Sequence, residues 1–291
     1  MFEGIHTALI TPFRDGQVDE EALRAHVERQ IEAGIDGVVP CGSTGESATL
    51  SHLEHRRVVE IVVDAAKGRV PVIAGTGSNS TREAIELTLH AKQAGADGSL
   101  LLSPYYNKPT QEGIYAHYAA IAEATRFPLV LYNIPGRTAS NIAPEIIARL
   151  ARLEHVVGVK EACGNVDQIA HVIAKCPQDF AVLSGDDSLT LPLLALGAKG
   201  VISTTSNVAP RQIADLVRRF ERGDVAGAQA LHHALLPLFD VLFCETNPIP
   251  VKAAAAELGY CRPEIRLPLT RITDPNLERL KLVLKDLEIL R

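Results

Sequence analysis

Several features that would place a protein in a class at once are scarce or missing from this chain of 291 residues. Hydrophobic runs stay short of the roughly 18 residues that a membrane-spanning helix requires. Basic blocks are also absent, and 29 lysines and arginines stand against 35 aspartates and glutamates, a net charge of −6. We therefore expect neither a nucleic-acid partner nor a membrane-inserted protein.

Cysteines and metal-binding patterns are few as well. The five cysteines are odd in number, far apart and without a CxxC pair, so a zinc ribbon and a disulfide framework are both poor interpretations. The histidines form no HxH or HExxH spacing, and we expect no metal site. Residues 1–6 carry neither the basic nor the apolar part of a secretion signal. The composition favours a globular cytoplasmic enzyme.

Short apolar runs alternate with amphipathic stretches through residue 223. The runs predict strands at residues 6–12, 37–42, 70–77, 98–105, 128–135, 156–162, 181–187 and 200–207. The stretches between them predict helices at residues 21–34, 52–68, 81–95, 111–125, 144–152, 166–176, 188–198 and 210–223. Four of these helices close on a glycine, which leaves a helix easily in the left-handed conformation: Gly34, Gly68, Gly95 and Gly223.

Eight strand-then-helix units predict a (β/α)₈ TIM barrel over residues 1–223, in the α/β class. Several strands are apolar on both faces, as in a parallel sheet covered by helices. A doubly wound open sheet is the alternative, but the glycines of residues 75–80 do not complete a dinucleotide fingerprint. From residue 224 the pattern is helical only, at 224–243, 250–259 and 276–290. We expect a C-terminal three-helix extension over residues 224–291.

Chemistry in such a barrel sits at the C-terminal ends of the strands. Lys160 is the one lysine of nine that caps an uninterrupted apolar strand. It could simply pair with a buried carboxylate. However, the neighbouring strand ends supply Tyr, Ser, Thr and Arg, and desolvation favours the neutral amine that attacks a carbonyl. The resulting iminium is an electron sink, so Lys160 predicts a Schiff-base aldolase or lyase.

Three other strand ends carry candidate side chains. Tyr132 could transfer protons at the attacked carbonyl, or be an ordinary core tyrosine. Ser43 and Thr44 could bind a carboxylate, or be loop and helix-cap residues. Arg137 follows a Pro-Gly turn and could grip a carboxylate bidentately, although most loop arginines are only solvated.

Six motifs in order resemble the dihydrodipicolinate synthase and N-acetylneuraminate lyase family of class I aldolases over essentially the whole chain. They are Gly42-Ser-Thr-Gly-Glu-Ser47, Pro104-Tyr-Tyr-Asn-Lys-Pro109, Tyr132-Asn-Ile-Pro-Gly-Arg-Thr138, Gly158-Val-Lys-Glu-Ala162, Ser184-Gly-Asp186 and Asn247-Pro-Ile-Pro-Val-Lys252. The resemblance implies condensation of pyruvate with L-aspartate 4-semialdehyde, the committed step toward diaminopimelate and lysine, with pyruvate held as a lysine imine and no separate cofactor.

The resemblance also implies a role for each matching residue. Lys160 matches the Schiff-base lysine and Tyr132 the proton donor and acceptor. Ser43 and Tyr106 match the remaining hydroxyls of a proton relay, with Tyr106 reaching in from a neighbouring subunit. The positions that match substrate-binding residues are Thr44 and the backbone at Ile202 for pyruvate, Arg137 for the semialdehyde carboxylate, and Gly185. Position 43 is usually threonine in the family, and serine keeps the hydroxyl but loses a methyl that restrains its rotamer.

Two other functions remain open. A sialic acid or 2-keto-3-deoxy sugar acid aldolase shares the lysine and tyrosine, but the form of the motif that contains Arg137 argues against it. A non-catalytic small-molecule-binding barrel would be expected to lose Lys160 or Tyr132, and both are present.

A regulatory site and an assembly are implied in addition. In lysine-inhibited members, L-lysine binds at a dimer interface, and suitable residues fill every matching position here: Ser47, Ala48, His52, His55, Asn79, Glu83 and Tyr105. They could equally be polar residues on exposed helix faces. A relay tyrosine supplied in trans needs at least a dimer, and the resemblance implies a homotetramer built as a dimer of dimers.

Overall fold

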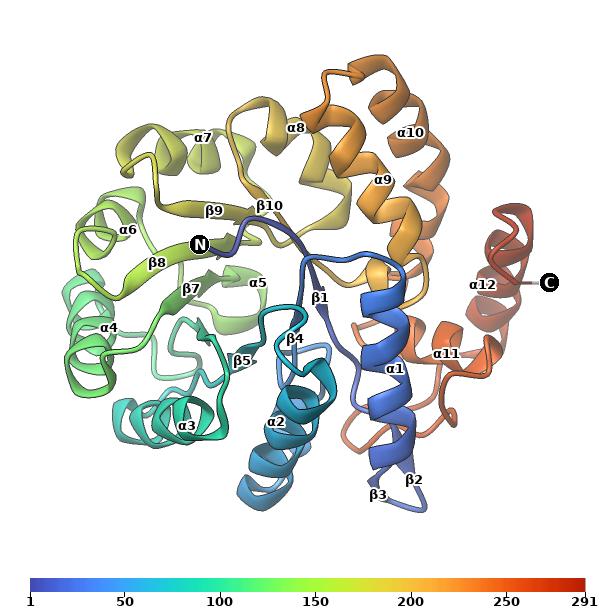
Figure 1. The fold of residues 1–291 in the computed structure, drawn as a ribbon, viewed down its shortest axis with the longest axis horizontal. Coiled ribbons are helices and arrows are strands. Elements are labelled where there is room, and N and C mark those ends of the chain that lie inside the picture. The colour runs from blue at the N-terminus through green and yellow to red at the C-terminus, as the bar shows by residue number, and fades with distance from the viewer. Residues whose placement is uncertain (291) are drawn as a thin grey trace.

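Eight parallel strands form a closed ring in the computed structural model, which describes residues 1–290 (Figure 1). One sheet runs in the order β4-β1-β10-β9-β8-β7-β6-β5, and a parallel bridge between Val38 and Val72 joins its two edges. The strands are β1 Gly4–Ala8, β4 Gly37–Val39, β5 Ile73–Gly75, β6 Gly98–Leu102, β7 Leu129–Asn133, β8 Val156–Glu161, β9 Ala181–Ser184 and β10 Gly200–Ser203. The predicted (β/α)₈ barrel is confirmed, and the open doubly wound sheet is excluded.

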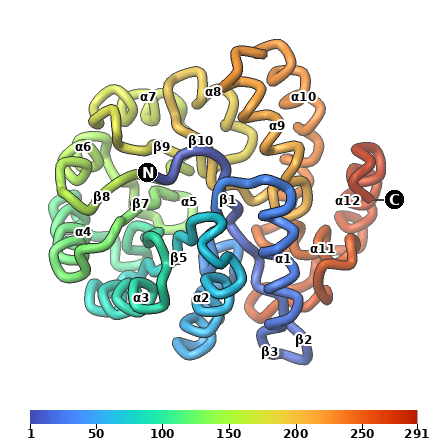
Figure 2. The backbone as a smooth tube through the Cα atoms, viewed as in Figure 1, coloured from blue at the N-terminus to red at the C-terminus, as the bar shows by residue number. Residues whose placement is uncertain are grey.

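A ring of helices surrounds the strands, as both backbone views show (Figures 1 and 2). These helices are α1 Glu20–Glu32, α2 His52–Ala66, α3 Thr81–Ala94, α4 Gln111–Thr125, α6 Pro144–Leu150, α7 Val166–Lys175, α8 Thr190–Ala195 and α9 Pro210–Glu221. Local sequence sets their ends. Ser51 and Glu54 form a capping box at the start of α2, and Gly95 ends α3 with φ of +90°.

The predicted strands run past the observed C-terminal ends of the strands, and β1 begins at Gly4, two residues before its predicted start. At the second barrel strand, for example, Cys41 takes a left-handed φ of 57° that extended pairing does not allow. Several small elements were not predicted. Among them, a hairpin of β2 (Phe13–Arg14) and β3 (Gln17–Val18) follows β1, and one helical turn, α5 (Pro135–Thr138), follows β7.

Apolar side chains fill the inside of the barrel. Alternate residues of β7 point inward and outward, so Val130 and Tyr132 join the interior cluster while Leu129 and Leu131 pack against the helices. Phe2 belongs to the interior cluster, and a Cβ on Gly98 would lie 2.7 Å from its ring. Glycine at position 98 therefore leaves room for Phe2, and the barrel interior is a packed core rather than a pore.

Three further helices follow the barrel: α10 Val225–Val241, α11 Ile249–Glu257 and α12 Asp274–Asp286. Helix α10 packs on α9, and α11 and α12 lie on the α1 side of the ring (Figure 2). Just after α11, the Tyr260 ring lies 4.0 Å from the guanidinium of Arg29 on α1. The predicted extension is thus present, while its division from the barrel at residue 223 stays a prediction. Among residues 1–290, no helix is long and apolar enough to cross a membrane.

Candidate active site

Lys160 and Tyr132 face each other inside the barrel. They are register partners on β8 and β7, and the Lys160 Nζ atom lies 4.4 Å from the centre of the Tyr132 ring. Both are nearly buried, with 5% and 6% of their surface exposed. In the described part of the chain, lysine ion pairs involve Lys175, Lys252 and Lys281, and none involves Lys160. The arrangement suits an amine available for reaction better than one committed to a buried carboxylate.

Two acidic residues lie near this pair: Asp186, which follows β9, and Glu161, which is next to Lys160 on β8. Burial raises the pKa of Asp186, and the positive charge of Lys160 partly opposes that rise. Glu161 lies on the opposite side of β8 from Lys160, where both carboxylate oxygens accept hydrogen bonds from the Asn133 amide at 3.1 and 3.2 Å. Burial raises the pKa of Glu161 to about 7. The outward face of β8 thus carries a carboxyl group that titrates near neutral pH.

Thr44 and Arg137 are joined through a residue from the far end of the chain. The Asn247 side-chain amide donates to Thr44 Oγ1 at 3.0 Å, and the Arg137 guanidinium donates to the Asn247 carbonyl oxygen at 2.8 Å. Thr44 Oγ1 also lies 3.4 Å from Thr204 Oγ1 at the end of β10. Asn247 therefore links the loop after β4 to the helical turn after β7.

A cavity of about 440 Å³ opens beside these residues. Ser43, Tyr132, Arg137 and Asn247 all line it. The Asn247 Oδ1 atom is buried and accepts no hydrogen bond from the described residues, so one acceptor on the cavity wall is unoccupied. The cavity is of the size that small-molecule sites have in proteins.

The residues that line this cavity do not include the other predicted catalytic and substrate-binding residues: Lys160, Thr44, Ile202, Gly185 and Tyr106. Ile202 is fully buried in β10 and packs in the barrel interior. Gly185 donates its backbone N–H to the Glu161 carbonyl oxygen at 2.6 Å, and a Cβ there would lie 2.7 Å from the side chain of Ala162. Tyr106 is 88% exposed and has a left-handed φ of 71°. Within one chain, Tyr106 therefore points to solvent rather than toward Lys160.

Six of the seven positions of the predicted lysine site line the same cavity: Ser47, Ala48, His52, His55, Glu83 and Tyr105. Glu83 contacts His52 Nε2 at 3.0 Å and accepts a hydrogen bond from Ser78. Asn79 lies behind this wall, and its amide donates to the Tyr105 carbonyl oxygen at 3.2 Å. These six regulatory positions thus line the same cavity as Ser43, Tyr132 and Arg137.

A model of the dihydrodipicolinate synthetase family matches residues 1–287. The chain belongs to this family. The 4-hydroxy-tetrahydrodipicolinate synthase of Syntrophus aciditrophicus is 58% identical over 286 residues, which are 98% of each protein. A chloride-inhibited dihydrodipicolinate synthase from Acinetobacter baumannii, solved with pyruvate, is 46% identical with a TM-score of 0.97 over all of both chains. The enzyme from Cyanidioschyzon merolae, solved with lysine bound, is 42% identical with a TM-score of 0.96 over 99% of each chain.

These likenesses confirm the predicted activity of this dihydrodipicolinate synthetase family member. The chain is a lyase that condenses pyruvate with L-aspartate 4-semialdehyde, in the route to diaminopimelate and lysine. The family match also bears out the expectation that a lysine imine, rather than a separate cofactor, does the covalent work. The alternatives of a sugar acid aldolase and of a non-catalytic barrel are set aside.

Sequence reasoning missed a buried ion pair that this family member forms beneath the loop of residues 42–47. Lys252 of α11 contacts the Glu46 carboxylate, and the two side chains are only 3% and 1% exposed. Burial lowers the pKa of Lys252, and the charge of Glu46 opposes that change. Breaking such a pair by removing one partner costs about 3–5 kcal/mol, since the other charge stays buried.

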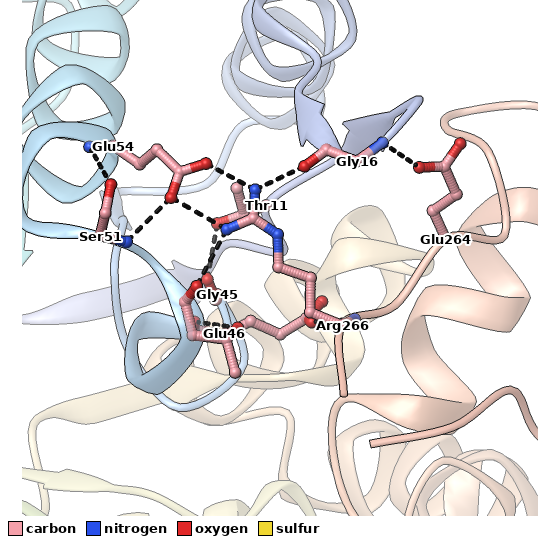
Figure 3. A network of polar contacts seen from close by, with 9 residues as sticks. Thr11, Gly16, Gly45, Glu46, Ser51, Glu54, Glu264 and Arg266 are labelled. Atoms are coloured by element: carbon pink, nitrogen blue, oxygen red, sulfur yellow. Dashed lines mark hydrogen bonds and ion pairs between the residues drawn. The ribbon is translucent and has the colours of Figure 1, made fainter. Parts of the chain in front are cut away.

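Arg266 completes this network, and Figure 3 shows its contacts with Glu46, Glu54 and Gly16 from close by. Its guanidinium forms two hydrogen bonds with Glu54, at 2.5 and 3.0 Å, and donates to the Gly16 carbonyl oxygen at 2.7 Å. Its backbone N–H donates to the second oxygen of Glu46 at 3.1 Å. One signal in the sequence could have indicated the pair: Lys252 is the only charged residue in the apolar run from 247 to 256.

Proposed function

We propose that Lys160 is the nucleophile of the condensation. Its Nζ attacks the keto carbon of pyruvate, and loss of water from the carbinolamine leaves an imine between Nζ and that carbon. Loss of a proton from the pyruvate methyl then gives an enamine, whose carbon adds to the aldehyde of L-aspartate 4-semialdehyde. The single observation that supports this role most directly is the nearly buried Lys160 amine, free of an ion pair and 4.4 Å from the Tyr132 ring centre.

Tyr132 is proposed to transfer the protons of these steps. Carbinolamine dehydration needs a donor at the leaving oxygen, and enamine formation needs an acceptor. Tyr132 is the hydroxyl-bearing side chain directly beside Lys160, and Ser43 lines the same cavity. Ser43 would pass the proton onward, with Thr44 holding the pyruvate carboxylate and the backbones of Gly185 and Ile202 bordering the imine.

Arg137 is proposed to bind the carboxylate of the semialdehyde. Its guanidinium lines the cavity and is oriented by one hydrogen bond to the Asn247 carbonyl oxygen, which leaves other N–H groups for a ligand. The unoccupied Oδ1 of Asn247 suits the amino group of the same substrate. That amine then attacks the imine carbon, which releases Lys160 and closes the ring of 4-hydroxy-tetrahydrodipicolinate.

Tyr106 is proposed to act in the site of a neighbouring subunit. It is the most exposed aromatic side chain of the described residues and is held in a left-handed conformation that such residues adopt at a cost. Burial in a partner would account for both features. The working unit is then at least a dimer, and we propose the homotetramer of two such dimers.

Borohydride reduction in the presence of pyruvate tests the role of Lys160. We expect a reduced pyruvyl adduct on the peptide that contains Lys160, found by peptide mass spectrometry. Lys160→Ala should give no adduct and no turnover, while the control Lys175→Ala, which removes an exposed lysine, should behave as wild type. An adduct on another lysine, or none on the folded wild type, contradicts the proposal.

We further propose that L-lysine inhibits the enzyme from the part of the cavity lined by Ser47, His52 and Glu83. The ligand's ammonium group would replace His52 as the partner of Glu83, while Tyr105 and Asn79 would hold its carboxylate. Glu83→Gln should weaken inhibition by lysine on the order of tenfold, in line with the loss of a charged hydrogen bond. Glu86→Gln on the same helix is the control, and equal inhibition of both variants would refute this site.

A cytoplasmic location is proposed as well. Cys41, Cys163, Cys176, Cys244 and Cys261 are all unpaired, as is usual for proteins of reducing compartments.

A further inference from the structure

The C-terminal extension contacts the loop of residues 42–47, which carries Ser43 and Thr44. Glu46 is the point of attachment: one carboxylate oxygen contacts Lys252 of α11, and the other accepts the backbone N–H of Arg266 at 3.1 Å. Glu46 is 4% exposed and has a left-handed φ of 54°. An unfavourable backbone conformation at a buried, fully engaged carboxylate indicates that its surroundings hold it in place.

Short hydrogen-bonded turns transmit the position of Glu46 to the neighbouring residues. Its backbone N–H donates to the Ser43 carbonyl oxygen at 3.2 Å, and the Gly45 N–H donates to the Gly42 carbonyl oxygen at 3.0 Å. Thr11 donates to the Gly45 carbonyl oxygen at 2.7 Å. The loop is therefore a compact unit, and a shift of Glu46 displaces Ser43.

The charges beneath the loop are balanced. Two cations contact the Phe13 ring, with Lys252 Nζ 3.9 Å and the Arg266 guanidinium 4.2 Å from its centre. Glu46 neutralises the first cation, and Glu54 forms an ion pair with the second. Neutralising Lys252 leaves the Glu46 carboxylate buried with only a backbone N–H, and such a group moves toward water or takes up a proton.

We propose that Glu46 and Lys252 are positioning residues for pyruvate binding: their buried contact fixes where Ser43 and Thr44 lie relative to Lys160. On this basis α11 supports the active site: Glu46 lines the cavity beside Ser43, and Lys252, which does not line it, holds Glu46 in place. The inference rests on the proposed roles of Ser43 and Thr44. A displacement of about 1 Å at such hydroxyls can slow a reaction up to roughly a hundredfold.

Two variants and a matched control test the proposal. Lys252→Met removes the charge at similar length, and Glu46→Gln keeps an oxygen for the Arg266 N–H. The control Lys281→Met makes the same substitution on α12, where Lys281 contacts Glu257 and Glu278 at 3.7 and 3.3 Å, and leaves the loop untouched. We would measure the KM of each substrate, the rate of borohydride trapping with pyruvate, and the Tm.

We expect the KM for pyruvate to rise on the order of tenfold, and trapping to slow to match, in Lys252→Met and Glu46→Gln. The KM for the semialdehyde should change far less, and Lys281→Met should match wild type in every kinetic value. If both variants fold with a lowered Tm but unchanged pyruvate kinetics, the pair is only structural and the proposal is wrong. If Lys252→Met does not fold, Glu46→Gln decides. Absence of trapping in wild type would instead refute the proposed function.

Discussion

Tyr132 and Lys160 sit opposite each other on adjacent parallel strands, with the Lys160 Nζ atom 4.4 Å from the centre of the Tyr132 ring. The contact runs through the face of the ring, so the phenol hydroxyl is free to serve the reaction. The aromatic ring and the hydroxyl of Tyr132 can therefore be tested separately.

Tyr132→Phe keeps the ring beside Lys160 and removes only the hydroxyl. We expect kcat to fall by roughly 10²–10⁴, the usual contribution of a proton-transfer group, with little change in Tm. Steady-state kinetics and thermal denaturation measure both. Wild-type turnover in this variant would assign the proton transfer to another group.

Arg137→Lys keeps the charge and loses the forked geometry that a carboxylate prefers. We expect kcat/KM for the semialdehyde to fall about 10–100-fold, since a charged hydrogen bond is worth roughly 1.5–3 kcal/mol. Borohydride trapping with pyruvate should be unaffected, because Arg137 is assigned to the second substrate. The control is Arg149→Lys, at an arginine that pairs with Glu112. Equal losses for both substrates would contradict the assignment of Arg137.

Mixing two inactive variants tests whether Tyr106 acts in trans. Tyr132→Phe and Tyr106→Phe chains, dissociated together and reassembled, should regain about a quarter of wild-type activity, because half of the dimers are mixed and each has one intact site. The separately treated variants serve as controls. If Tyr106 serves its own chain, the mixture stays as inactive as its components.

Glu161 predicts a pH dependence of stability. Burial raises its pKa to about 7 in the folded protein from 4.5. Between these values the folded chain holds a proton that the unfolded chain has released, so stability falls as the pH rises and is about 3 kcal/mol lower above pH 7.

Glu161→Gln removes this ionisation and keeps an acceptor for Asn133. The Tm of the variant minus the Tm of wild type, measured by thermal denaturation, should therefore be larger at pH 8 than at pH 5. The exposed Glu123→Gln serves as control. The same relative Tm of Glu161→Gln at both pH values would contradict the prediction.

The sequence predicted the barrel because strand and helix patterns are local. The alternation of apolar runs and glycine-closed helices depends on neighbours a few residues apart, and it placed Lys160 and Tyr132 at strand ends. The predicted strand ends were less accurate. At Cys41, for example, the chain takes a left-handed conformation without the glycine that usually indicates one. The β2–β3 hairpin contains only two residues in each strand, too few for a periodic signal.

The part of the site that sequence reasoning missed depends on contacts between distant segments. Asn247 reaches Thr44 across 203 positions, and Lys252 reaches Glu46 across 206. The lone charge of Lys252 in an apolar run indicates that it needs a buried partner, but nothing in the pattern around Glu46 indicates that Glu46 is that partner. Pairings of this kind are determined only when the complete fold brings the segments together.

These long separations along the sequence also determine when the active site can form during synthesis of the chain. A chain made from its N-terminus has produced Glu46 long before Lys252 and Arg266, and β1 waits for β10, with Gly4 opposite Gly200, before the barrel can close. Contacts so far apart in sequence form late and slowly. The loop of residues 42–47 therefore gains its contacts with Lys252 and Arg266 only when translation is nearly finished. A prematurely terminated product that lacks α11 contains Lys160, but its loop of residues 42–47 has no support from Lys252.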